Sequence, residues 1–291
     1  IIFATYPQKV AFPVYSQEEW FSDRWDAIDY GVDYDFSRPF FEQFYDLSQK
    51  VPRPSKSALR MINSDYSNNS IDLKNCYLIF NSGYSTDCAY GNAVNHSNQC
   101  FDNSNLNYGE LCYEVFNSAR CSRVFFSIGI VDSNDIFFSK NLRGCSNCFG
   151  CMNLRNKSYC IFNKEYTKEE YEKRLKEYNL GSYSHLIKIL EKADNFWLKF
   201  PNKFAEHGTK SVDVIGDYIY WSRNVKYTYQ CIGGENLKYC QYVNYSHTKD
   251  CYDHTIYGEN TELSYECAMV GDKAYNLKFC PQTYGGVRDL E

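Results

Sequence analysis

The sequence has little net charge and lacks the motifs that usually mark an enzyme. Its 291 residues carry 31 Lys and Arg against 36 Asp and Glu, a formal charge of −5, with only 7 Pro and 3 Met. A charge this small and diffuse gives no electrostatic footprint for nucleic acid or an anionic membrane, so we expect no nucleic-acid partner. There is no Gly-rich phosphate loop, no nucleophile elbow and no His-Glu-x-x-His zinc motif. These absences favour a non-catalytic role and leave an enzyme as the alternative.

Long apolar runs are absent as well. No stretch approaches the roughly 18 residues that a spanning helix needs, so we expect no membrane span. Residues Ile1 to Tyr6 lack the basic segment and apolar core of a signal peptide. We therefore expect a cytoplasmic protein, although the chain does not begin with Met and a removed targeting segment stays open.

Aromatic residues and cysteine are abundant instead. The chain holds 28 Tyr, 20 Phe and 14 Cys. A high, even cysteine count can indicate a disulfide framework, but that inference belongs to short secreted chains. Without a secretory signal we expect reduced thiols, and the order of the residues suggests why they are there.

The cysteines belong to a repeat with a period of 12 residues. One column is apolar and small or medium in size: Cys76, Cys88, Cys100, Cys112, Val124, Ile136, Cys148 and Cys160. The next residue in each repeat is also apolar: Tyr77, Ala89, Phe101, Tyr113, Phe125, Phe137, Phe149 and Ile161. Three residues before the first column lie small residues: Ser85, Ser97, Gly109, Cys121, Ser133 and Cys145. Five residues after it lie mostly Asn: Asn81, Ala93, Asn105, Asn117, Gly129, Asn141 and Asn153.

The same period returns near the C-terminus. A second apolar column reads Ile219, Cys231, Val243, Thr255, Cys267 and Phe279. Its polar column reads Asn224, Asn236, Thr248, Asn260 and Asp272. Cys160 and Cys231 are not separated by a multiple of 12, so something is inserted between two blocks of one repeat.

Stacked strands explain such columns. Residues at a fixed period lie above one another when each turn of a wound chain adds about 4.8 Å along its axis. An Asn column then forms a side-chain ladder, and Asn tolerates the left-handed backbone of a tight corner. The sequence thus predicts a mainly β protein, a parallel β-helix or solenoid, with right-handed winding as the default for parallel crossovers.

The length of one turn follows less directly from the sequence. A 12-residue turn encloses little room and would force the aromatic column to point outwards. Because Cys121 and Cys145 alternate with Ser or Gly in their column, we expect turns of 24 residues, each holding two repeats.

Four segments follow from these patterns. Residues 1–62 are non-repetitive and rich in aromatics, and we expect them to cap the solenoid. Residues 63–164 form the first block and 209–291 the second. Between them, 165–208 reads as a helical hairpin, because Thr167 and Glu170 form a capping-box pattern and Pro201 ends an apolar helical face.

The most suggestive metal motif is Cys145-x-x-Cys148-x-x-Cys151. Three thiols at this spacing can hold zinc with a fourth ligand such as Cys121, and redox chemistry is a further alternative. Cys145 and Cys148 also fall on columns that hold Ser, Val and Ile elsewhere, which favours core packing. We therefore expect no cofactor, with zinc as the candidate to test.

Two surfaces are candidates for function. Carboxylates such as Asp87 and Asp135, which share a column, suggest a carbohydrate-active β-helix, as do Asp250, Asp253, Glu259, Glu262 and Glu266. Tyrosines crowd the second block, and we expect Tyr229, Tyr242, Tyr245 and Tyr257 to form a binding face for a protein or glycan.

Several strings resemble one family. They include Tyr15-Ser-Gln-Glu-Glu-Trp-Phe-Ser-Asp-Arg-Trp-Asp, Asp33-Tyr-Asp-Phe-Ser-Arg-Pro-Phe-Phe-Glu-Gln-Phe, Asn75-Cys-Tyr-Leu-Ile-Phe, Gly144-Cys-Ser-Asn-Cys-Phe-Gly-Cys-Met-Asn-Leu-Arg-Asn-Lys and Tyr166-Thr-Lys-Glu-Glu-Tyr-Glu-Lys. Over nearly the whole chain, the sequence resembles uncharacterised proteins of candidate-phylum bacteria that carry the label caib/baif. That label comes from an acyl-CoA transferase class, whose nucleotide-binding architecture and catalytic Asp setting this sequence does not show.

The resemblance implies a domain plan and one difference. Members of the family carry Cys-x-x-Cys zinc ribbons ahead of the repeats. The second pair falls on Ser16 and Glu19 here, so an N-terminal zinc ribbon is not expected.

Our expectation for function is a non-catalytic solenoid that presents a Tyr- and Asn-rich face to a protein or glycan, because stacked turns give a long regular surface. The alternatives are a polysaccharide lyase or hydrolase that uses surface carboxylates, and a zinc- or redox-dependent module. The oligomeric state is open.

Overall fold

The computed structural model describes residues 4–200, 211–239, 241–244, 248–253, 255–257 and 262–265. The protein is mainly β, with 44% strand and 17% helix, and it contains a large, mostly parallel sheet. The chain divides into two compact units, Ile1–Phe200 and Pro201–Glu291. Among the described residues, no helix combines the length and the apolar character needed to cross a bilayer.

The first unit opens with a non-repetitive segment. It contains β1 (Val14–Tyr15), α1 (Gln17–Trp20), the 3-10 helix η1 (Ala27–Tyr30), α2 (Phe40–Ser48) and β2 (Arg53–Pro54). Strand β1 pairs in parallel with β2, and the Gln17 side chain donates a hydrogen bond to the carbonyl of Ala58. The segment is thus attached to the first turn of the sheet. Ser16 caps α1 by accepting a hydrogen bond from the Glu19 amide at 3.1 Å, so Ser16 and Glu19 belong to a helix start.

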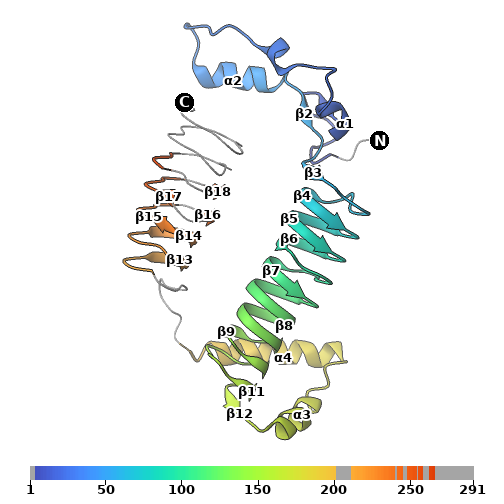
Figure 1. Ribbon diagram of the computed structural model, residues 1–291, viewed down its shortest axis with the longest axis vertical. Helices are drawn as coiled ribbons and strands as arrows, with labels where there is room; N and C mark the ends of the chain where they lie inside the picture. Colours follow the sequence, from blue (N-terminus) through green and yellow to red (C-terminus); the bar gives the residue numbers. More distant parts are fainter. Residues whose placement is uncertain are drawn as a thin grey trace. The chain divides into compact units, whose positions relative to one another are not determined.

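A ten-stranded sheet follows, visible as a ladder of arrows in Figure 1. Its strands are β3 (Ala58–Leu59), β4 (Asn68–Lys74), β5 (Tyr77–Thr86), β6 (Ala89–Asn95), β7 (Ser104–Glu110), β8 (Tyr113–Phe137), β9 (Lys140–Arg143), β10 (Ser146–Phe149), β11 (Ser158–Ile161) and β12 (Lys164–Glu165). Each strand from β3 to β10 pairs in parallel with a segment 12 residues further along the chain, as Cys148 does with Cys160, and β11 pairs antiparallel with β12. The expected 24-residue turn is therefore wrong, since it would pair residues 24 apart.

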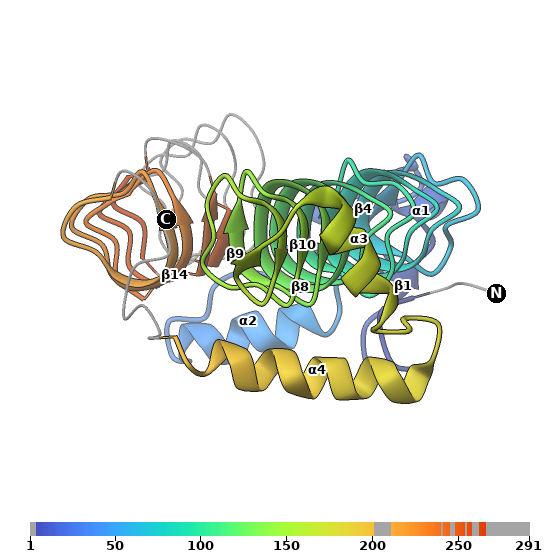
Figure 2. The same cartoon turned by 90° about the horizontal axis from the view of Figure 1, so that it is seen from below.

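Each turn consists of four triplets. From Ser64 to Cys151 every third residue is buried, and most residues that precede a buried one have positive φ. The Asn column predicted to turn corners does so: Asn81, Asn105 and Asn141 have φ of 53°, 58° and 57°. A left-handed residue in every triplet bends the backbone repeatedly, so the chain returns to its starting face after four triplets. Figure 2 shows these turns superposed.

The turn length also decides where the aromatic column points. Cys76 to Cys160 are buried in one core cluster, as expected. The residues that follow them point outwards, with Tyr77 45% and Phe101 44% exposed. A 12-residue turn has room for four inward side chains only, so the aromatic rings stand on its outer surface.

Two helices close the first unit. Helix α3 (Lys168–Lys176) begins at the predicted capping box, where Thr167 and Glu170 cap one another, and α4 (Tyr183–Trp197) follows. Their apolar sides pack on the aromatic surface of the last turns, in a cluster with Phe138, Phe149 and Ile161. The hairpin thus covers a side of the sheet as well as its end.

The second unit repeats the same triplet pattern less regularly. Its described strands are β13 (Ile215–Tyr220), β14 (Lys226–Ile232), β15 (Gly234–Glu235), β16 (Gln241–Asn244), β17 (Thr248–Lys249) and β18 (Thr255–Tyr257). Ile219, Cys231 and Val243 pair as predicted. Further on, Gly234 pairs with Thr248 and Gln241 with Thr255.

These pairings overturn two column assignments. Thr255 does not stack on Val243, and the left-handed corner of Asn236 continues at Asp250, because two extra residues shift the register. Thr248 instead points inwards and is buried. The predicted column members Cys267, Phe279, Asn260 and Asp272 lie outside the described residues.

Candidate functional site

The bore of the first unit is lined by small polar side chains that complete the backbone hydrogen bonding. The Ser133 hydroxyl donates to the carbonyl of Val131 at 2.7 Å and accepts the amide of Cys145, one turn later, at 3.0 Å. Ser64, Ser82, Ser97, Ser118, Ser127 and Ser139 accept amides one turn later in the same way. Because the amide of an inward residue faces the dry interior, a hydroxyl beneath it removes the penalty of an unpaired donor.

The cysteines substitute for serine in this arrangement. Cys145 follows Ser133 in the same column, and its thiol donates to the carbonyl of Arg143, again two residues earlier, at 3.4 Å. The Cys151 sulfur accepts the amide of Asn163, again one turn later, at 3.4 Å. A thiol is larger and less polar than a hydroxyl, so it fills the bore while making weaker versions of the same bonds. This is a structural role for the thiols.

The predicted zinc ligands are only partly brought together. Cys145, Cys148 and Cys151 point into one turn, and the Cys148 thiol hydrogen-bonds to the other two. Cys121 lies two turns earlier in the column of Cys145, so it is not their neighbour; Cys160, stacked on Cys148, is. Within the part of the chain that the structure describes, no group of three or more His, Cys, Asp or Glu side chains is arranged to hold a metal ion. Zinc therefore stays an untested alternative to the expected absence of a cofactor.

The protonated thiol is favoured at Cys145, Cys160 and Cys231. Desolvation raises the pKa of Cys160 and of Cys231 above the ordinary thiol value. The pKa of Cys145 is raised by its hydrogen bond with Cys148 and by burial. Since the thiolate is the reactive form, these cysteines are poor nucleophiles in the folded protein.

The corners carry ladders of polar side chains. Asn69 donates to Asn81 at 2.6 Å and Asn141 to Asn153 at 2.7 Å, each across one turn. Arg60, Arg120 and Arg123 make bidentate pairs with Asp72, Asp132 and Asp135 in the same way. The side-chain groups that could bind a polar ligand are thus already hydrogen-bonded to one another in these ladders.

The carboxylates predicted for catalysis are held in these ladders. Asp87 accepts a hydrogen bond from Asn75 at 2.9 Å, and Asp135 accepts two from Arg123 at 2.5 Å. Asp87 and Asp135 share a corner column four turns apart, about 19 Å at about 4.8 Å per turn. A glycosidase needs its two carboxyl groups about 5 to 9.5 Å apart, so this pair does not supply acid and base.

The other predicted carboxylates add no cluster. Asp250 and Asp253 occupy left-handed corners, and Glu262 pairs with Lys249 in a β-bridge. Glu259 and Glu266 lie outside the described residues.

A file of aromatic rings runs along one outer side of the first unit. Tyr66 contacts Tyr77 edge to face at 5.5 Å, and Tyr77 contacts Tyr90 at 5.7 Å. Further along, Tyr113, Phe126, Phe138, Phe149 and Phe162 follow one another at 5.1 to 6.1 Å. The rings of the file therefore change from Tyr-rich to Phe-rich along the axis.

Helices cover one end of this file and leave the other end exposed. Helices α3 and α4 bury the far end, where Phe138 is 1% exposed and Phe149 fully buried. The near end is open: Tyr66, Tyr77, Tyr90 and Phe101 are 44% to 53% exposed, and we call these four residues the aromatic strip. The strip is an apolar surface with a covered continuation, which is typical of a docking site.

Sequence reasoning missed this strip. The column of Tyr77 and Phe101 was visible, but with a 24-residue turn its members did not have to face outwards. The missed signal is the three-residue spacing of inward positions, which places every residue after a cysteine on the outer surface.

The Tyr face predicted for the second unit is described only in part. Tyr229 is half-buried and packs edge to face on Tyr218 at 5.9 Å. Tyr242 and Tyr257 lie on β16 and β18, and nothing beyond their backbone is described, whereas Tyr245 lies outside the described residues. This face stays a prediction.

Comparisons with known proteins add little. No family model and no curated protein matches the chain. One matching solved structure is titled "Crystal structure of putative acetyltransferase from Desulfovibrio desulfuricans G20"; it is 10% identical, with a TM-score of 0.14. The match covers 75% of this chain and spans 62% of that one. A TM-score this low carries no inference about fold or activity.

Proposed function

We propose that this chain is a β-solenoid with 12-residue turns that binds an amphipathic helix of a protein partner on its aromatic strip. It acts as a non-catalytic binding or scaffold module. One observation carries the proposal: the strip is the open continuation of a surface that already holds a helix. Right-handed winding remains part of the proposal.

Helix α4 shows what kind of partner this surface accepts. Its apolar side, with Ile189 and Ala193 buried, lies on the Phe-rich end of the file. Ile189 and Ala193 are one helical turn apart on the side that faces the rings, and α4 crosses the stack of turns instead of running along it (Figures 1 and 2). The strip offers a similar row of apolar rings, with tyrosine hydroxyls for polar contacts.

The flanking segments fit the same proposal as caps. An exposed end of a stacked sheet is an unpaired edge that invites aggregation. The N-terminal segment hydrogen-bonds to the first turn through Gln17 and through the Thr5 amide, which donates to Ser55 at 2.9 Å. At the other end, β12 turns back antiparallel on β11 and Tyr171 of α3 is buried. Both ends of the first unit are thereby covered.

A peptide with the sequence of residues 183–197 tests the proposal, because that helix already packs on the continuation of the strip. The labelled peptide is titrated into the full chain and followed by fluorescence anisotropy. We expect saturable binding, weakened at least tenfold by the double substitution Tyr77→Ser/Tyr90→Ser. The matched control is Tyr84→Ser/Tyr108→Ser, which removes two rings of similar exposure, 55% and 59%, from the opposite corner of the turns; it leaves binding unchanged.

Two results would contradict helix binding. One is the absence of any saturable binding; the other is equal affinity in all three proteins. Binding on a glycan array that Tyr77→Ser/Tyr90→Ser abolishes would instead assign the strip to sugars. Release of product from a polysaccharide panel would favour the carbohydrate-active alternative.

A further inference from the structure

The first unit contains a second exposed apolar surface, on helix α2. Phe40, Phe41, Phe44 and Tyr45 are 51% to 70% exposed. Their spacing of one, four and five residues places them on one face of the helix. Four large aromatic side chains on a helix of nine residues, all open to solvent, indicate a surface that is covered in a complex.

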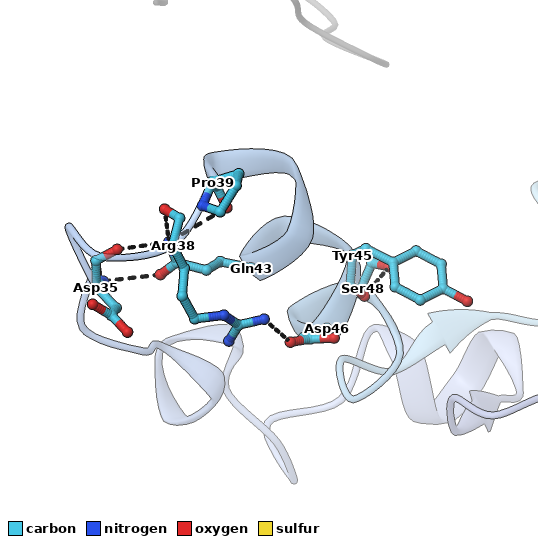
Figure 3. A network of polar contacts seen from close by, with 7 residues as sticks. All are labelled: Asp35, Arg38, Pro39, Gln43, Tyr45, Asp46 and Ser48. Atoms are coloured by element: carbon cyan, nitrogen blue, oxygen red, sulfur yellow. Dashed lines mark hydrogen bonds and ion pairs between the residues drawn. The ribbon is translucent and has the colours of Figure 1, made fainter.

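The other side of α2 is fixed by polar contacts (Figure 3). The Gln43 amide donates to the carbonyls of Asp35 and Arg38 at 2.9 Å, and its oxygen accepts the Asp35 amide at 2.9 Å. Arg38 forms an ion pair with Asp46 at 2.8 Å. These bonds hold the helix and the loop before it in one conformation, so the aromatic face is presented without an ordering penalty at binding.

The aromatic strip has the dimensions that α2 requires. A nine-residue helix is about 14 Å long at 1.5 Å per residue. Tyr66 to Phe101 spans three steps between turns, also about 14 Å. Both surfaces are aromatic and uncharged at their centre, and α4 shows that this file of rings accepts an apolar helix face.

We propose that α2 of a second copy of this chain occupies the aromatic strip. The inference rests on the proposed function and names its partner. If each copy gives its helix and receives the other, the contact is made twice about a two-fold axis, which closes the assembly as a dimer. A single short helix binds weakly, and the doubled contact raises the effective concentration of the second one.

Sedimentation velocity of the full chain between 1 and 100 µM tests this. We expect a dimer for the natural sequence. Two variants should be monomers over the whole range, Phe41→Ser/Phe44→Ser on the helix and Tyr77→Ser/Tyr90→Ser on the strip. The control Tyr84→Ser/Tyr108→Ser should remain dimeric, which separates the strip from a general loss of surface tyrosine.

Mixing the two monomeric variants is the sharper test. The helix variant keeps an intact strip and the strip variant an intact helix, so one complete contact forms between them. A mixed dimer, weaker than the natural one, is expected only from the mixture. A natural chain that stays monomeric at 100 µM would overturn the proposal, as would a mixture that never associates.

The helix variant also separates this inference from the proposed function. Because α2 of the helix variant cannot occupy the strip of another copy, the strip of this variant stays open. The 183–197 peptide should therefore bind the helix variant more tightly than the natural chain. Peptide binding without dimerisation would reject the second copy and keep helix binding. Dimerisation that both double variants retain would reject α2 as the occupant.

Discussion

Substituting Gly109 by Ala probes how tightly the bore is packed. Gly109 is an inward position, and a Cβ atom there would lie 2.5 Å from Cδ2 and 2.8 Å from Cγ of Leu106. Leu106 is fully buried in the main core cluster, so it has no free space to move into. Overpacking of this kind destabilises a core by about 1–3 kcal/mol, and we expect that loss in the free energy of unfolding.

Other turns hold larger residues in the column of Gly109. Cys121 occupies the same column one turn later, but its neighbour three residues earlier is the small Ser118. In the turn of Gly109 that neighbour is Leu106. Three turns later, Leu142 and Cys145 fill the same two positions and both are buried, so the close approach at Gly109 depends on where the Leu106 side chain lies.

The assay is urea denaturation of the full chain followed by far-UV circular dichroism. Leu106→Val alone should cost about 0.5–1.5 kcal/mol. It also removes the atoms that meet the new methyl group. The double variant Leu106→Val/Gly109→Ala should therefore lose less free energy of unfolding than the two single variants lose together.

The matched control is Gly181→Ala in the loop between α3 and α4. There the nearest atom to an added Cβ is the Asn179 side-chain oxygen at 3.9 Å, and stability should be unchanged or slightly higher. Equal stability of the Gly109→Ala variant and the natural chain, or strict additivity in the double variant, would refute an inward Gly109.

Three further predictions follow from the same packing. Eleven of the 14 thiols are buried and free, so Ellman's reagent should leave them unlabelled in the folded chain, and all 14 should react in guanidinium; rapid labelling of those eleven under native conditions would contradict the packing. Phe138→Ala should destabilise the first unit by about 3–5 kcal/mol and speed proteolysis within the α3–α4 hairpin, whereas Tyr84→Ala, at an exposed ring, should do neither. The hydrogen bond from Arg120 lowers the pKa of Asp132, so their ion pair stabilises the fold above about pH 4 and is lost as the pH falls through that lowered pKa. Asp132→Asn should therefore cost up to about 1 kcal/mol at pH 7 and nothing near pH 2, as measured by thermal unfolding.

Much of the fold could be predicted because equivalent positions hold equivalent residues. The cysteine column and the Asn corners follow from the 12-residue period, and α3 from its capping box. These features are local or strictly periodic, so residue type alone reveals them.

The turn length could not be obtained in the same way. Inward positions hold an apolar residue in some triplets and serine in others, as in the run Leu73, Cys76, Ile79, Ser82, Ser85. The three-residue period therefore does not show as a hydrophobic pattern. Serine looks like a surface residue, but here its hydroxyl pairs with the backbone inside the bore. The register shifts of the second unit were hidden because its later paired residues are 14 or 13 positions apart, which a fixed 12-residue period does not follow.

The candidate site depended on this missing information. Tyr77 and Phe101 are surface residues only if one turn holds 12 residues, and the openness of the strip depends on where α4 stops. Both are properties of the assembled unit. Sequence could show that the aromatic residues recur, but it could not show which of them a helix covers.

A designed disulfide tests the 12-residue turn most directly. Asn98 and Glu110 are exposed and pair as neighbours one turn apart, about 4.8 Å between Cα atoms, within the range that a disulfide spans. The double variant Asn98→Cys/Glu110→Cys should close under mild oxidation, with a mass loss of about 2 Da and no new reactive thiols. Asn98→Cys/Ser122→Cys, two turns apart at about 9.6 Å, should stay reduced. Closure of the second pair and not of the first would contradict the account.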